Sequence, residues 1–417
     1  MPTLTRLFIW LAAAVIVALS LAAADSAVAG PAPPQRQLKT YALHNSPNSA
    51  DISPDEQLVV TESTVKSDGA DSGTKTFFET VQVWNFKEDK LIAEFRTQGG
   101  DASAYTNAHP KTAFLDLNPA RGARFVRFSP DGSKVVALIG HTIYVLRASD
   151  LTELRTIPLV APPSTTQTFR EGTAVGKPEV RGMEISPRGS IVALLWVRGL
   201  LYGRVQIYDL SSGRILQSWN TPQGWISFTR GIAWDPSGKL LLIAIPNVFP
   251  CASPDNEPDI FAFDVRTGAI KKKFTTGLVT GSIGISSDNR VLAVDLNCPG
   301  VFKNHHPKLR VFDLATGKRL RAVSGRGTDV RYLVSVSADG NRFLAFTGKV
   351  KAKFGWGDFA PHRVVVDETF SVWNLKNYQG IVTSQNIPGL LASGLRLSPN
   401  GGYAVSYGKA SFVYELP

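Results

Sequence analysis

The chain has 417 residues, of which 43% are hydrophobic and 19% charged, and its formal net charge is +11. This apolar fraction excludes a disordered chain, because it is large enough to form a buried core. The positive charge favours anionic partners but does not specify a fold. Gly (36) and Pro (26) punctuate runs of β-branched and aromatic residues, a pattern typical of short strands joined by turns, and we therefore predict an all-β protein.

Residues 1–29 have the pattern of a signal peptide. Arg6 precedes an apolar run from Leu7 to Leu21, and Ala27-Val28-Ala29 forms a small-x-small cleavage site before Gly30. Counted through Ala24, the run also approaches the length that spans a bilayer, so an uncleaved anchor is the alternative. We favour cleavage, which predicts an extracytoplasmic protein, periplasmic or secreted, with no stable membrane insertion afterwards. Residues 30–36 then form a Pro-rich linker.

From residue 37 to residue 417 the chain contains one unit repeated seven times. The first half of each unit is an apolar strand that ends in a corner of the Ser-Pro-Asp-Gly type. Pro fixes φ for a turn and Gly or Asn accepts positive φ, so each corner reverses the chain between two strands. The seven corners lie at residues 53–55, 129–132, 186–189, 235–238, 286–289, 337–340 and 398–401.

The second half of the unit is an alternating strand that ends on an aromatic and a polar residue. Examples are Trp84-Asn85, Tyr208-Asp209, Phe263-Asp264, Phe312-Asp313 and Trp373-Asn374. A short turn and a more polar strand follow. These features predict four antiparallel strands per unit, which is the composition of a propeller blade.

The corner and the aromatic-polar strand end resemble the WD40 and YVTN-type β-propeller repeat families. The resemblance covers residues 37–417 and implies a seven-bladed β-propeller of four-stranded antiparallel blades. It implies no function, because such propellers have many unrelated activities. The Gly-His that opens many of these repeats is missing, so their His–Asp network is not expected here.

The last unit contains only three strands before the chain ends at Pro417. We expect residues 37–43, with apolar Leu38, Tyr41 and Leu43, to supply the outer strand of the last blade. This pairing would close the ring and remove its open edges.

The long insertions all fall in the connections between strands two and three of a blade or between blades. In a propeller these connections share one face, which we call the loop-bearing face. Function concentrates on loops held by a rigid scaffold, so this face is the predicted contact surface; neutral loop growth is the alternative. The insertions are residues 65–79, 98–123, 160–180, 221–229, 246–259, 298–308 and 349–368.

Arg124, Arg181 and Arg230 stand where the innermost strands of three consecutive units begin. We expect them to converge on the central channel, where guanidinium groups could grip a carboxylate, phosphate or sulfate. Alternatively, each pairs with a neighbouring acid such as Glu179 or Glu184.

Three further residues on the insertions are candidate ligand contacts: Trp225, Trp356 and His362. Exposed aromatic side chains suit a protein interface or stacking on sugars, although they could equally pack the loops together.

Cys251 and Cys298 occupy equivalent places in adjacent units, and an even cysteine count in an exported chain predicts a disulfide between them. A metal site formed with His305 and His306 is the alternative, but no CxxC or HxxxH spacing supports it, and we predict no metal.

No HExxH, GxSxG or phosphate-binding glycine loop is present, so we predict no catalytic residue and no cofactor. Nucleic acid is not an expected partner either, since no base-reading motif is present. The resulting hypothesis is an exported, monomeric scaffold that binds a protein or an anionic component of the cell envelope. The alternative is an enzyme or redox subunit, lactonase-like or quinoprotein-like, with its site at the channel mouth.

Overall fold

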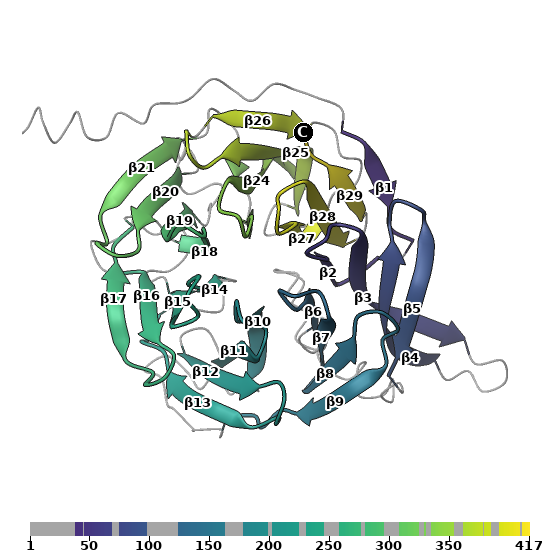
Figure 1. The fold of residues 1–417 in the computed structure, drawn as a ribbon. Helices are drawn as coiled ribbons and strands as arrows, with labels where there is room; N and C mark the ends of the chain where they lie inside the picture. Colours follow the sequence, from purple (N-terminus) through teal and green to yellow (C-terminus); the bar gives the residue numbers. More distant parts are fainter. Residues whose placement is uncertain are drawn as a thin grey trace, which may run out of the picture.

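The computed structural model contains strands β1 to β29, which form seven antiparallel sheets around a central axis (Figure 1). We number the sheets as blades 1 to 7. The structure describes residues 38–44, 46–68, 75–97, 124–162, 178–198, 202–224, 231–245, 258–276, 280–295, 308–324, 329–330, 335–353, 362–377, 379–384, 392–408 and 411–417.

The strands of each blade run in chain order from the axis to the rim. Blade 1 contains β2 (Ser49–Ile52), β3 (Leu58–Asp68), β4 (Lys75–Asn85) and β5 (Lys90–Arg96). Blade 2 contains β6 (Arg124–Phe128), β7 (Lys134–Ile139), β8 (Thr142–Arg147) and β9 (Glu153–Pro158). Blade 3 contains β10 (Glu179–Ile185), β11 (Ile191–Arg198), β12 (Tyr202–Asp209) and β13 (Ile215–Asn220). Blade 4 contains β14 (Ile232–Trp234), β15 (Leu240–Ala244), β16 (Ile260–Asp264) and β17 (Ile270–Phe274).

Blade 5 contains β18 (Thr280–Ile285), β19 (Arg290–Asp295), β20 (Lys308–Asp313) and β21 (Arg319–Ser324). In blade 6 two short segments, β22 (Asp329–Val330) and β23 (Ser335–Val336), both pair with β24 (Arg342–Lys353), which is followed by β25 (His362–Asn374) and β26 (Gly380–Ser384). Blade 7 contains β27 (Ala392–Leu397), β28 (Tyr403–Gly408), β29 (Phe412–Glu415) and β1 (Thr40–Ala42). The predicted seven-bladed, all-β propeller is confirmed.

Strand β1 closes the ring as the sequence predicts. Its three residues pair antiparallel with β29, from Thr40 opposite Tyr414 to Ala42 opposite Phe412. Blade 7 is therefore assembled from both ends of the chain, which leaves β29 with a partner on each side.

The corners of neighbouring blades interlock, which explains why they need Pro and Gly. Gly132, at φ 71°, lies so close to blade 1 that a Cβ there would be 3.3 Å from Cδ of Pro54. Gly189, also at φ 71°, meets Pro130 of blade 2 in the same way, again at 3.3 Å. These two corners thus pack on the proline of the blade before them, and a side chain at either glycine would be both strained and crowded.

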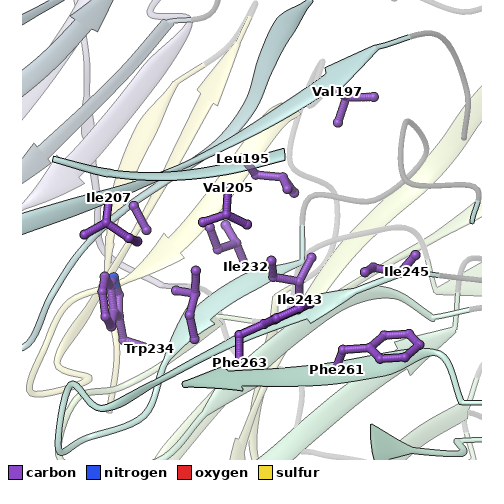
Figure 2. Packing of buried hydrophobic residues seen from close by; sticks show 12 residues of the cluster. Leu195, Val197, Val205, Ile207, Ile232, Trp234, Ile243, Ile245, Phe261 and Phe263 are labelled. Carbon is purple, nitrogen blue, oxygen red and sulfur yellow. The ribbon is translucent and has the colours of Figure 1, made fainter. Parts of the chain in front are cut away.

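The core consists of separate apolar clusters, several of which lie between two neighbouring blades. Figure 2 shows the cluster of blades 3 and 4, in which Ile207 and Leu195 of one blade face Trp234 and Ile243 of the next. Its members come from inner and middle strands whose alternate residues point to the same side, the pattern that period-two hydrophobicity predicts.

Two of the predicted loop insertions, residues 65–79 and 349–368, form largely strand. In blade 1, β3 and β4 stay paired from Leu58 opposite Asn85 out to Asp68 opposite Lys75. In blade 6, β24 and β25 stay paired out to Lys353 opposite His362. Each segment contains a short run that favours strand, Thr76 to Phe78 in the first and Val364 to Val366 in the second. We call them the blade 1 hairpin and the blade 6 hairpin.

The predicted signal peptide (1–29) and linker (30–36) lie outside the described residues. No helix with the length and apolar character of a membrane span occurs among the residues that are described.

Candidate functional site

One position in each innermost strand, two residues before the corner, forms a ring that we call the axial ring. On blades 7, 1, 2 and 3 this position is charged, whereas blades 4, 5 and 6 carry small residues. In blade order the axial ring is Asp51, Arg127, Glu184, Ala233, Gly284, Ser335 and Arg396.

Arg396 links three blades across the axis. Its Nη1 lies 3.0 Å from Oε1 of Glu184 and its Nη2 lies 3.5 Å from Oε2, so blade 7 grips blade 3 with a forked contact. Its Nε lies 3.3 Å from Oδ1 of Asp51 on blade 1. Arg127 approaches the same Glu184 Oε1 at 3.7 Å. The four side chains form a compact network of two guanidinium groups and two carboxyl groups.

Polar side chains of the innermost strands also satisfy the backbone of the next blade. Oδ2 of Asp51 accepts a hydrogen bond from the N–H of Phe128 at 3.0 Å, and Oγ of Ser49 accepts one from the N–H of Val126 at 3.1 Å. Between blades 6 and 7, Oγ of Ser335 accepts the N–H of Leu397 at 2.8 Å. An innermost strand has a free edge, so these contacts supply the partners that a further strand would otherwise provide.

The electrostatics of the network are balanced. Burial favours the neutral form of Glu184, but the charges of Arg396 and Arg127 outweigh it and hold the pKa of this carboxyl below its ordinary value. Burial raises the pKa of Asp51, and the two arginines oppose that shift only in part. The network contains two guanidinium groups and two carboxyl groups, so most of its charge is satisfied within the network itself.

The two arginines of the predicted anion site that the structure describes are each engaged by a glutamate. Arg124 begins β6, donates from Nη2 to Oε1 of Glu79 at 2.5 Å, and has only 6% of its side chain exposed. Arg181 lies at a bulge in β10 and pairs with Glu179 at 2.9 Å. These ion pairs are the alternative that the sequence left open, and binding of an outside anion stays a prediction.

No protein-family model matches the chain, and no curated protein matches it. Among solved structures, this chain is similar to the C-terminal WD40 domain of Sif2. The similarity covers 93% of this chain and 100% of that domain, with 12% sequence identity and a TM-score of 0.48. The seven sheets, their strand order and their corners decide the matter. The chain is a seven-bladed β-propeller.

Several predicted site residues of this propeller are not described by the structure. Arg230, Trp225, Trp356, Cys251 and Cys298 lie outside the described residues, so the predicted disulfide and aromatic contacts stay predictions. His362 is the first residue of β25, and its backbone pairs with that of Lys353. Within the described ranges, no group of three or more His, Cys, Asp and Glu side chains is placed to hold a metal ion.

The four charged residues of the axial ring were not predicted from the sequence. The pattern was available, because Asp51, Arg127, Glu184 and Arg396 all precede a corner residue by two positions. Aligning the seven corners and asking which column carries compensating charges would have found it.

Proposed function

We propose that this propeller is an exported scaffold that binds a protein partner, or an anionic component of the cell envelope, through its loop-bearing face. The observation that carries the proposal is the difference between the two faces of the ring. Strands alternate in direction from axis to rim, so the corners and the turns between the third and fourth strands share one face, the turn-bearing face. The other two kinds of connection leave from the loop-bearing face.

On the turn-bearing face every connection is short. Residues 53–57, 129–133 and 186–190 are typical corners, and residues 210–214 and 265–269 are typical turns. The corners pack against each other from blade to blade, so this face has little freedom to adapt to a partner.

On the loop-bearing face, two blades are prolonged into hairpins. Strands β3 and β4 have 11 residues each, and β24 and β25 have 12 and 13, whereas β7 and β8 have 6 each. Figure 1 shows the blade 1 hairpin extending past the ring beside β5. Projections built on a rigid ring are suited to contact, and the net charge of +11 adds attraction to anionic surfaces.

The experiment shortens each hairpin without disturbing its blade. Val65 and Phe78 are directly paired, so replacing residues 66–77 with Asn-Gly closes the blade 1 hairpin by a two-residue turn. Val350 and Val365 allow the same replacement of residues 351–364 in blade 6. The matched control is Arg188→Ala in an exposed corner of the turn-bearing face.

Each variant is used for affinity purification from an envelope fraction of cells that export the protein. We expect the full chain and the R188A control to recover the same partner, and at least one shortened hairpin to lose it while keeping the melting temperature. Recovery that neither deletion changes, or that R188A abolishes, would refute the proposal. A stoichiometric metal or organic cofactor in the purified protein would favour the enzyme alternative.

A further inference from the structure

A buried pair of carboxyl groups lies where the blade 1 hairpin leaves the ring. Glu62 is on β3 and Glu79 on β4, and in the register of these strands Glu62 faces Val81 while Thr64 faces Glu79. The two glutamates are therefore diagonal neighbours on one face of the sheet. That face meets blade 2, since β3 packs against β6.

The charges at this seam do not balance. Arg124 of β6 is the cation of the cluster, and it is committed to Glu79 Oε1 at 2.5 Å and to the hydroxyl of Thr64. Asn48, which precedes β2, is uncharged and donates to Thr64 Oγ1 at 3.4 Å. Among the described residues, the charged groups that face Glu62 are thus Glu79 from its own blade and Arg124 from the next, which makes two carboxyl groups against one guanidinium.

Glu62 is wholly buried, and neither of its carboxyl oxygens makes a hydrogen bond of normal geometry in the described part of the chain, although the side chains of Glu79 and Asn48 are near enough to affect its protonation. The second oxygen of Glu79, Oε2, is also buried without a partner there. An unpaired carboxylate in such a place is strongly unfavourable, whereas a protonated carboxyl is neutral and can donate its O–H to a neighbouring oxygen.

We propose that Glu62 and Glu79 form a proton-binding site at the seam of blades 1 and 2, which holds one proton at neutral pH and releases it in mildly alkaline solution, loosening the base of the blade 1 hairpin. Burial raises the pKa of Glu62 to about 8; the negative charge of Glu79 adds to the shift and Arg124 opposes it. Release of the proton leaves two carboxylates beside one guanidinium, and their repulsion acts between β3, which packs on β6, and β4, whose Glu79 pairs with Arg124 of β6.

The effect on stability has a definite sign. The folded protein binds the Glu62 proton more tightly than the unfolded chain does, so the stabilisation is complete below about pH 4.5 and is lost as the pH rises to about 8. Across this window the equilibrium constant for unfolding rises by up to about tenfold per pH unit from this group, and it levels off above.

The test follows the proton directly in the full mature chain. Infrared spectra between pH 6 and pH 9.5 are expected to show a protonated-carboxyl band that disappears with a midpoint near 8. Glu62→Gln, which keeps the shape and removes the titration, is expected to lack this band. The matched control, Glu94→Gln on β5 of the same blade, is expected to retain it.

Amide hydrogen exchange supplies a second measurement that does not depend on any variant folding. Between pH 7 and pH 9, after correction for the intrinsic rate, residues 58–68 and 75–85 are expected to lose protection by up to about tenfold, while β12 keeps its protection. A titrating band that survives in E62Q, the absence of any band, or equal loss of protection in β12 would overturn the proposal. No partner is present in either experiment, so their outcome is independent of the proposed function.

Discussion

Glu56 of blade 1 supplies a carboxylate to the corner of blade 7, which has none of its own. In five of the other six blades the fourth corner position is Gly, and in blade 5 it is Asn289; Glu56 adopts the same left-handed conformation, with φ 57°. Its Oε1 accepts hydrogen bonds from the Ser398 hydroxyl at 2.6 Å and from the N–H of Gly402 at 3.1 Å. Blade 7 has Asn400 where most corners carry Asp, so a carboxylate from blade 1 replaces the local one.

We expect Glu56→Gly to lower the melting temperature even though it relieves a left-handed conformation that costs about 1–2 kcal/mol. Two charge-assisted hydrogen bonds between the first and last blades are lost, and each is typically worth about 1.5–3 kcal/mol. Asn289→Gly is the matched control: φ is 63° and the side chain makes no hydrogen bond recorded in the described ranges, so relief of strain alone should raise the melting temperature slightly. Equal shifts of the melting temperature in both variants would show that the hydrogen bonds of Glu56 do not stabilise the contact between blades 1 and 7.

Asp209 should make the protein sensitive to acid. Hydrogen bonds from the Ser211 hydroxyl and the Ser212 N–H lower its pKa to about 2, below the value in the unfolded chain. The stabilisation that the ionised Asp209 carboxylate gives the folded protein is therefore complete above the ordinary pKa of 3.8 and is lost as the pH falls through 2. Urea unfolding at pH 4 and pH 2.5 should show a smaller loss of stability for Asp209→Asn than for the native chain; an identical loss would contradict the assignment.

At the level of elements, β1 carries the closure of the ring. Besides its backbone pairing, Tyr41 donates a hydrogen bond to Glu415 at 3.0 Å, and Leu38 is buried in a cluster with Leu395, Leu397 and Leu416. Deleting residues 37–44 should lower the melting temperature strongly, because it exposes both this cluster and the edge of β29. A melting temperature that does not change in calorimetry would disprove the closure.

The elements that the sequence could predict are those set by local chemistry. Corners such as 129–132 follow from Pro and Gly, and Asp209 and Asp313 end their strands because their carboxylates accept the N–H groups of the next turn. The closing strand followed from a count of strands in the last blade. Each of these inferences needed only neighbouring residues or the repeat itself.

The elements that the sequence could not predict depend on contacts between distant residues. Arg396 and Glu184 are 212 positions apart, so their pairing does not follow from either local sequence; aligning the corners shows a charged column but not which of its members touch. The hairpin character of residues 65–79 was missed for a related reason, because a strand needs its cross-strand partner and the polar residues of that segment resembled a loop.

At the level of the whole molecule, the axial ring should contribute to stability through Arg396. Arg396→Met leaves Arg127 as the cation beside Glu184 and Asp51. We expect the free energy of unfolding to fall by up to about 3 kcal/mol, the lower end for a buried ion pair, because the side chains of Arg396 and Glu184 are about a quarter exposed. Arg147→Met removes an ion pair in which both side chains are about half exposed and should cost less than about 1 kcal/mol. Urea unfolding of both variants checks the contrast, and equal losses would show that the network has no special role.

The central claim is that the loop-bearing face, and not the turn-bearing face, is the contact surface. A photo-reactive amino acid placed in turn at position 75 or 353 on the hairpins, and at position 188 on a corner, tests it in cells that export the protein. We expect covalent adducts with one discrete partner from position 75 or 353 and none from position 188. Adducts from position 188 alone would contradict it.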